Sequence, residues 1–366
     1  MVEKGVFAAR AERLAKLLEG EGLDGVIMVP GPNIRYFTGV ESFLLERPFM
    51  LLFSAHGGPH LVAPELEAGP YRRSPLEISV HPWTDSEGPA AAIARAAKDA
   101  GFEGRWAVEG RAPFGYLQRL SRASRAKLED GDSVLQGLRE IKDEAEAKLL
   151  RRSAAILSKS FREFPELLKE GMMETDVAKA ATDIIYQNGA DRVDDMLVQS
   201  GARAADPHSL PSLKKVRRGE SVVVDVGSTY GGYYSDITRT FCLGAAKDVE
   251  SVYGEVLEAQ ERAIVAAKDG AEVGDVDGAA RGVLRRAGHG KQFTHRTGHG
   301  LGLEIHEAPY IVQDGKEKLR EGMCFTVEPG VYLTGRLGVR IEDDVLMSGK
   351  AGEEITRVPK DYGWWR

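Results

Sequence analysis

Hydrophobic positions in the first third of the chain alternate between helical and strand periods. Short apolar runs bounded by turn residues predict buried strands at 25–29, 50–53, 60–63 and 106–109. Apolar residues at helical spacing predict helices over 6–20, 88–100 and 112–127. Strands that alternate with helices indicate an α/β domain.

The pattern changes after residue 127. Periodicity lapses over 128–138, and a long amphipathic helix follows over 141–164. We therefore predict a first domain at 1–135 and a second at 136–366. In the second domain, helices are expected at 174–188, 246–268 and 275–288, with a loop and hairpin at 201–244 and glycine-rich strands at 292–347. This mixture indicates an α+β domain.

Two aspartates converge on one face of a predicted hairpin. Residues 220–241 form two arms rich in β-branched and aromatic residues around a Tyr-Gly-Gly turn at 230–232. Asp225 and Asp236 are 11 residues apart, so a turn of even length places both on the same face. A turn on the tyrosine and first glycine pairs them directly, whereas a turn on both glycines makes them diagonal neighbours. Such a buried acidic pair is costly without a cation.

A second predicted ribbon brings two glutamates together. Its arms are 325–332 and 338–346, and a three-residue turn with Gly335 in the left-handed conformation joins them. This register sets Glu328 directly opposite Glu342. Either acidic pair alone is also explained by a solvated sheet face or a helix cap. Two converging pairs in one domain indicate a functional site.

Histidines gather beside these carboxylates. Four of the eight, His289, His295, His299 and His306, fall within 18 residues. Three glycines between 298 and 302 each disfavour a helix by about 1 kcal/mol, and the His-Glu-x-x-His pattern is absent. The histidines must therefore project from turns and strand ends. Carboxylates with an imidazole favour Mn²⁺, Co²⁺ or Zn²⁺, and bridging carboxylates suggest two ions about 3.5 Å apart.

Composition narrows the function classes. With 366 residues, 42% hydrophobic and 29% charged, the chain is typical of a globular protein of about two domains. Its net charge of −7 gives no general attraction to nucleic acid or anionic lipid, so neither is expected as a partner. Two cysteines cannot build a disulfide framework, and no apolar run reaches membrane length. The N-terminal residues are interrupted by charges, so they are not expected to act as a secretory signal. A cytoplasmic location is therefore expected.

These motifs resemble the pita-bread metallopeptidases, specifically the branch of Xaa-Pro dipeptidases (prolidases) and Xaa-Pro aminopeptidases. The resemblance is carried by Asp225, Asp236, His299, Glu328-Pro-Gly and Arg340-Ile-Glu342. Residues 25–39 resemble the creatinase-type N-terminal domain of this branch. The resemblance implies an α/β creatinase-like N-terminal domain followed by an α+β pita-bread catalytic domain.

The resemblance also implies a dinuclear metal centre. Asp225 would bind one ion, Asp236 and Glu342 would bridge both, and His299 and Glu328 would complete the other. A hydroxide held between the ions would be the nucleophile, with Glu328 as general base. Two divalent ions per subunit are expected, Mn²⁺ first, with Co²⁺ or Zn²⁺ as alternatives.

Further matched residues are expected to contact the substrate. His208 and His306 match histidines that bind substrate and stabilise the tetrahedral intermediate. His295 matches a residue of the pocket near the scissile proline. Arg340 would hold carboxylates or the substrate chain, the alternative being an ion pair with Asp236 or Glu342.

The N-terminal domain is expected to cap the site, limit substrate length and make contacts in a homodimer. Arg47, on a predicted loop, is hypothesised to reach the partner subunit's site and bind a substrate carboxylate. A surface ion pair with Glu46 or Glu41 is an equally good explanation of this residue.

The expected activity is hydrolysis of the Xaa-Pro imide bond of dipeptides or short peptides by a two-metal exopeptidase. The preference for proline follows from the resemblance alone. An Xaa-Pro aminopeptidase acting on longer peptides is the main alternative, because compact enzymes of both kinds share the 14-residue interval between Glu328 and Glu342. A non-catalytic pita-bread interaction protein and a metal-free creatinase-like amidinohydrolase are further alternatives, and the intact ligand set argues against both. Hydrolysis of other amides or organophosphates remains open as a side activity.

Overall fold

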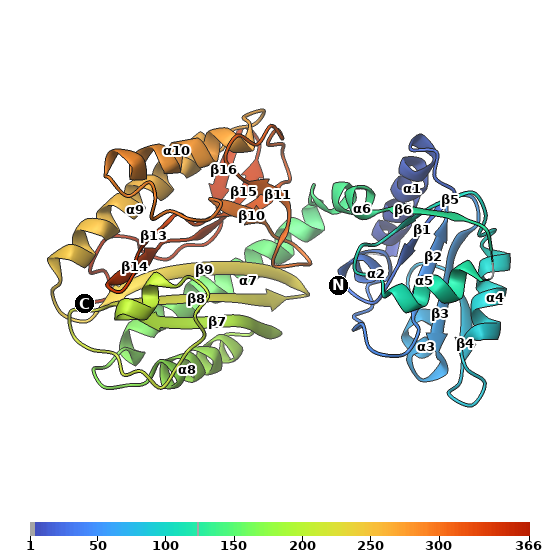
Figure 1. Ribbon diagram of the computed structural model, residues 1–366, viewed down its shortest axis with the longest axis horizontal. Helices are drawn as coiled ribbons and strands as arrows, with labels where there is room; N and C mark the ends of the chain where they lie inside the picture. Colours follow the sequence, from blue (N-terminus) through green and yellow to red (C-terminus); the bar gives the residue numbers. More distant parts are fainter. Residues whose placement is uncertain (1–3, 123) are drawn as a thin grey trace. The chain divides into compact units, whose positions relative to one another are not determined.

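The chain divides into two units between Arg139 and Glu140 in the computed structural model, which describes residues 4–122 and 124–366 (Figure 1). The division falls four residues after the predicted boundary at 135. Each unit has its own apolar core and is described separately below.

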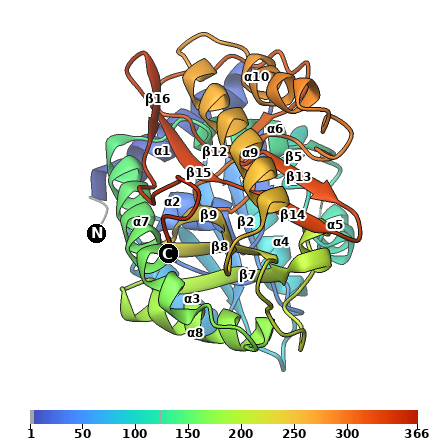
Figure 2. The same cartoon turned by 90° about the vertical axis from the view of Figure 1, so that its left-hand side faces the viewer.

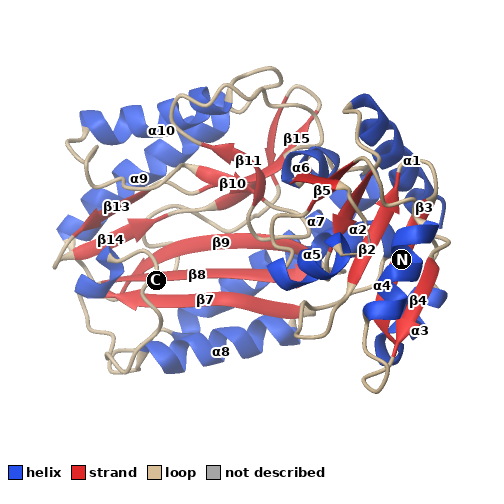
Figure 3. Cartoon of the chain, turned by 45° about the vertical axis from the view of Figure 1, so that its right-hand side comes forward, coloured by secondary structure: helices blue, strands red, loops and turns tan. Residues whose placement is uncertain are grey.

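A mixed six-stranded sheet forms the first unit. Its strand order is β4-β3-β2-β1-β5-β6, where β1 pairs antiparallel with β2 and parallel with β5. The strands are β1 (Gly25–Met28), β2 (Met50–Ser54), β3 (Gly58–Pro64), β4 (Ser79–Trp83), β5 (Arg105–Val108) and β6 (Lys127–Asp130). Figure 3 shows the helices packed around this sheet: α1 (Lys4–Gly20), α2 (Pro32–Thr38), α3 (Glu65–Arg72), α4 (Ala90–Asp99), α5 (Phe114–Ser121) and α6 (Asp132–Arg139). The predicted α/β class is confirmed.

Three local predictions for this unit are wrong. Pro32 and Asn33, which belong to the turn residues expected to end the strand at 25–29, instead begin α2, because a proline at the first helical position needs no hydrogen-bond partner for its nitrogen. The helix predicted to reach residue 127 ends at Ser121, and β6 follows as a mostly exposed edge strand without an apolar pattern. Residues 132–139 are helical, since Val134 and Leu138 form the buried face of α6.

The second unit contains three sheets. The first is β7 (Arg192–Ser200), β8 (Ser221–Tyr230) and β9 (Tyr233–Cys242). The five-stranded sheet has the order β11 (Glu307–Ile311), β10 (Gly298–Gly300), β12 (Cys324–Val327), β15 (Asp343–Ser348) and β16 (Ala351–Glu354). The third pairs β13 (Gly330–Leu333) with β14 (Leu337–Arg340). Strand β7 was not predicted, because its polar and apolar residues do not alternate regularly.

Two helix pairs cover these sheets (Figure 2). α7 (Glu144–Glu163) and α8 (Glu174–Gln187) pack on β7, β8 and β9 through one apolar core. α9 (Lys247–Ala266) and α10 (Val273–Arg286) pack on the strands between 324 and 347 through another. Short 3₁₀ helices lie at η1 (Phe164–Leu167) and η2 (Gly201–Ala205). The predicted α+β class of this unit is confirmed.

Candidate active site

The β8–β9 hairpin sets the relation between the two aspartates. Its turn consists of Gly231 and Gly232, whose φ angles of 61° and 85° are the left-handed values that a two-residue turn requires. Asp225 and Asp236 each pair with a residue two positions from the other. They are therefore diagonal neighbours, the second of the two predicted arrangements.

Strand alternation directs these aspartates away from the helices. Val222, Val224 and Val226 of β8 lie in the core shared with α7 and α8. Because successive side chains of a strand point to opposite faces, Asp225 projects from the other face. That face lines a cavity of about 620 Å³ in the second unit.

The predicted glutamate ribbon keeps its register but is not continuous. Its turn is at 334–336, with Gly335 at φ 75°, as predicted. Val327 faces Asp343 on one side of a break, and Gly330 faces Arg340 on the other. The same register thus runs through both segments, although they belong to different sheets.

Glu328 and Glu342 lie at this break. Pro329, which follows Glu328, has no N–H to donate, so the ladder is interrupted there. The prediction of one unbroken ribbon is wrong for this reason. Both glutamates line the cavity, where the two sheets separate.

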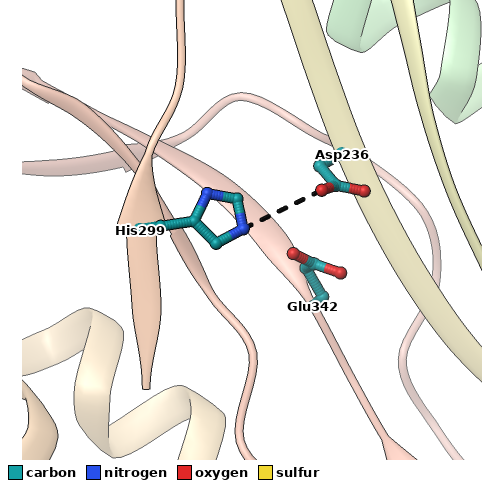
Figure 4. A group of neighbouring side chains, drawn as sticks. All are labelled: Asp236, His299 and Glu342. Atoms are coloured by element: carbon teal, nitrogen blue, oxygen red, sulfur yellow. Dashed lines mark ion pairs between the residues drawn. The ribbon is translucent and has the colours of Figure 1, made fainter. Parts of the chain in front are cut away.

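Three buried ligand groups that line the cavity come together. Ligand atoms of Asp236, His299 and Glu342 all lie within 4.8 Å of one another (Figure 4). The Nε2 atom of His299 is 4.0 Å from Asp236 Oδ2 and 3.4 Å from Glu328 Oε1. Its Nδ1 atom lies 3.2 Å from the carbonyl oxygen of Gly300, to which it must donate, so Nε2 is free to bind a metal ion.

The carboxylates of this cluster are electrostatically unfavourable without a cation. Burial raises the pKa of Asp236 and of Glu342 well above their usual range, and neighbouring carboxylates raise both further. Burial also raises the pKa of Glu328 to about 7. Among the residues that the structure describes, Asp236 Oδ1 is buried with no hydrogen-bond partner. A divalent cation would satisfy this oxygen and neutralise the cluster, so the donor set fits such an ion.

Asp225 is bound by a buried arginine. Arg340, only 3% exposed, donates a short hydrogen bond to Asp225 Oδ2. It also donates to the Tyr332 hydroxyl at 2.9 Å and to Thr238 Oγ1 at 3.1 Å. The considered ion pair with Asp236 or Glu342 is therefore replaced by one with Asp225.

The three remaining predicted histidines also line the cavity. His295 accepts from the Tyr332 hydroxyl at 2.8 Å and donates to the Arg296 carbonyl at 2.7 Å. Burial lowers its pKa to about 4, so it is neutral. The rings of His306 and His299 are perpendicular, with centroids 4.0 Å apart. His208 is exposed in the cavity on the loop after η2.

Arg47 lies in the first unit and is engaged by acidic neighbours. It forms two 3.1 Å contacts with the Asp85 carboxylate and one of 3.0 Å with Glu46. Glu41, the other partner considered, instead forms an ion pair with Arg35 at 3.1 Å. The structure thus contains the considered pair of Arg47 with Glu46 but not the one with Glu41. It adds Asp85 as a partner that the sequence did not suggest.

Two charged residues of the cavity were not anticipated. Arg296 lines the wall with its guanidinium carbon 4.5 Å from the Tyr310 ring centroid. Its place directly after His295, within the histidine-rich segment, was the available signal. Asp195 lines the cavity from a bulge in β7, which depends on strand pairing and leaves no sequence signal.

The described part of the chain contains no helix with both the length and the apolar character needed to cross a lipid bilayer.

Comparisons with known proteins cover nearly the whole chain. Residues 148–348 match metallopeptidase family M24, and residues 10–141 match the creatinase/prolidase N-terminal domain. The probable dipeptidase PepE of Mycobacterium tuberculosis is 36% identical over 361 residues, which cover 97% of this chain and 96% of the relative. The crystal structure of a prolidase from Thermococcus sibiricus has a TM-score of 0.92 at 36% identity, covering 97% of this chain and 98% of that one. An X-Pro aminopeptidase from Thermotoga maritima gives a TM-score of 0.84 at 32% identity, covering 96% and 98%. The resemblance inferred from the motifs is confirmed, and the chain belongs to metallopeptidase family M24 with a creatinase/prolidase N-terminal domain.

Proposed function

We propose that this protein is a metal-dependent Xaa-Pro dipeptidase. The observation that carries the proposal is the convergence of four carboxylates and the His299 imidazole on one cavity. Relatives named dipeptidase and prolidase, similar along nearly the full length, support this choice. We further propose a cytoplasmic homodimer, in which Arg47 keeps its hypothesised role of binding a substrate carboxylate in the partner's site.

Five residues would hold two divalent ions: Asp225, Asp236, His299, Glu328 and Glu342. Mn²⁺ is proposed first, with Co²⁺ or Zn²⁺ as alternatives, because the donors are mainly oxygen. Divalent cations bound there would supply Lewis acidity that polarises a carbonyl and lowers the pKa of water.

Glu328 is proposed as the general base. Its carboxylate lines the cavity and lies 3.4 Å from Nε2 of His299, next to the place where the attacking water would be held. It would take a proton from the attacking water and return it to the proline nitrogen as the imide bond breaks. The proline nitrogen needs this proton in order to leave, because it carries no hydrogen in the Xaa-Pro bond.

The histidines and Arg340 are proposed to bind substrate. His208 and His306 would donate hydrogen bonds to the carbonyl oxygen as it gains charge. His295, held neutral beside Tyr332, would lie against the proline ring. Arg340 would orient Asp225 through their hydrogen bond, and contact the substrate chain.

The position of Arg296 supports a dipeptidase rather than an aminopeptidase. Among the described residues, no carboxylate forms an ion pair with its guanidinium, which lines the cavity while stacked on Tyr310. An arginine so placed would bind the C-terminal carboxylate of a dipeptide. In a longer peptide, the proline carbonyl is an uncharged amide and loses this interaction.

An Xaa-Pro aminopeptidase is the second candidate, because the X-Pro aminopeptidase of Thermotoga maritima is also similar over nearly the full chain. The test is kcat/KM of the Mn²⁺-loaded protein on Leu-Pro, Leu-Pro-Ala and Leu-Ala. A dipeptidase is expected to prefer Leu-Pro over both other peptides. Preference for Leu-Pro-Ala would establish the aminopeptidase instead. Absence of cleavage would favour a non-catalytic interaction protein.

Arg296→Met provides a sharper test of dipeptide recognition. Its KM for Leu-Pro should rise about ten-fold, as expected for loss of a charged hydrogen bond. The KM for Leu-Pro-amide, which lacks the carboxylate, should be nearly unchanged. Equal effects on both peptides would remove Arg296 from carboxylate binding.

A further inference from the structure

A bulge in β7 presents an acidic side chain to the cavity. The pairing of β7 with β8 shifts register between Asp194 and Leu197, and Asp195 in the bulge has φ 51°. Aspartate adopts this left-handed conformation more readily than most residues, which suits it to the position. Asp195 is exposed and lines the cavity together with Leu197 and Ile305.

The Asp195 carboxylate takes part in no bond that holds the fold, although its charge raises the pKa of His306 against the larger effect of burial. Across residues 4–122 and 124–366, this carboxylate has no hydrogen bond or ion pair. The adjacent Asp194 differs, because it accepts from Arg192 Nε at 2.6 Å and from the Tyr234 hydroxyl at 2.9 Å. Asp194 therefore holds the strand, while the neighbouring carboxylate is available to a ligand.

Apolar side chains line the cavity between Asp195 and Asp236. Asp194, Gly227 and Asp236 are paired across the three strands β7, β8 and β9. The bulge is therefore about two strand spacings, or roughly 10 Å, from Asp236, and Asp225 projects from the strand between them. Ile305 lies over Gly227, since its Cδ1 atom is 2.5 Å from where a β-carbon would be. Leu197 pairs with Asp225 on the same side.

Distance decides which cation of a substrate can reach Asp195. The α-ammonium of a dipeptide lies about 2.5 Å from the scissile carbonyl carbon, so it stays near the cluster. A lysine side chain adds five single bonds of about 1.5 Å each, which bridges the remaining gap. Its methylenes would lie along Leu197 and Ile305, as apolar stems of cationic side chains do.

We propose that Asp195, Leu197 and Ile305 form a subsite for a long cationic side chain, lysine or arginine, at the N-terminal residue of the substrate. The inference rests on the proposed function for the position of the scissile bond. Such a subsite would make the protein selective for dipeptides with lysine or arginine before the proline.

The test compares Lys-Pro with norleucyl-Pro, which has a neutral side chain of similar length. In the Mn²⁺-loaded protein, kcat/KM for Lys-Pro should exceed that for norleucyl-Pro, and Asp195→Asn should reduce this ratio about five-fold. Asparagine keeps the shape and tolerates the left-handed backbone. Asp314→Asn is the matched control, because Asp314 is also exposed and left-handed, at φ 59°, but does not line the cavity. In this control variant, the ratio of kcat/KM for Lys-Pro to kcat/KM for norleucyl-Pro should equal that of the wild type.

Other outcomes overturn the subsite. An unchanged ratio in Asp195→Asn would show that the carboxylate does not contact the side chain. An equal loss on both dipeptides would assign it to the α-ammonium instead. If the wild type cleaved neither dipeptide, the proposed function would fail. Calorimetric binding of Lys-Pro and norleucyl-Pro would then decide the subsite separately, since equal affinities would refute it and a preference lost in Asp195→Asn would support it.

Discussion

Gln199 fixes the backbone on both sides of His208. Its Nε2 atom donates to the carbonyl oxygens of Pro207 and Ser209, at 3.0 and 2.9 Å. Gln199 is fully buried at the end of β7, whereas His208 is exposed in the cavity. A rigid strand therefore determines where the loop histidine projects, and Gln199 is a positioning residue for it.

Replacing Gln199 by leucine should lower kcat on Leu-Pro by about ten-fold, because two neutral hydrogen bonds of about 1 kcal/mol each are lost and His208 is less well placed. Bound metal should be unchanged. A double-mutant cycle with His208→Ala is the control, since the Gln199 effect should disappear once the imidazole is absent. Simply additive effects would show that Gln199 acts elsewhere.

Glu328 and His208 should separate metal binding from catalysis. Glu328→Ala should abolish turnover and weaken one metal site, because the residue is both proposed ligand and proposed base. His208→Ala should lower kcat by about 10²- to 10³-fold while the metal content stays constant. Kinetics and metal analysis of the same preparations check this. Appreciable activity of Glu328→Ala would reject its role as base, and metal loss in His208→Ala would make that histidine a ligand.

The buried ion pair of Lys142 and Glu307 should be expensive to break. Its Nζ–Oε1 distance is 2.9 Å, and the two side chains are only 1% and 4% exposed. Lys142→Met should lower the free energy of unfolding by about 3–5 kcal/mol, because an uncompensated buried carboxylate remains. The double variant Lys142→Met/Glu307→Leu should recover much of this loss. Lys148→Met, in a solvent-exposed pair with Glu144, should change the free energy of unfolding far less. Equal losses in urea denaturation for the two single variants would contradict this.

His60 and His81 should make the first unit sensitive to acid. The Nδ1 atom of His60 is 3.3 Å from Nε2 of His81 on the neighbouring strand. Burial lowers the pKa of both, and His60 lowers the pKa of His81 further, while Asp99 opposes the shift and Arg95 adds to it. Their contribution to stability is complete above the unfolded pKa of about 6.5 and is lost as the pH falls through the lower folded pKa. His60→Asn should lose less stability than the wild type between pH 7.5 and 5.5 in chemical denaturation. Identical pH profiles would refute the effect.

The sequence predicted those parts of the fold and site that depend on local pattern. The Gly335 turn follows from residue types and sets the register of the glutamates. The Tyr-Gly-Gly segment limited the first hairpin to two possible turns, and the structure has the one on Gly231 and Gly232. Strand β7 was missed, because its burial comes from pairing with β8 rather than from its own periodicity. Asp195 could not be found for the same reason, since a bulge exists only relative to a partner strand.

The interruption of the glutamate ribbon shows a second limit of the sequence. Glu328 and Glu342 follow a strand pattern on both sides, yet the segments belong to different sheets. Pro329 was visible in the sequence as a ladder breaker, but the separation into two sheets depends on packing against α9 and β10. Arg340 was correctly placed near the carboxylates, but its partner Asp225 depended on the tertiary arrangement.

The most direct test of the proposed two-metal dipeptidase is a titration of chelator-treated protein with Mn²⁺, in which bound metal and Leu-Pro hydrolysis are measured on the same samples. Hydrolysis should be absent without metal and should saturate at about two ions per chain. Hydrolysis of Leu-Pro that survives complete removal of metal would contradict the account.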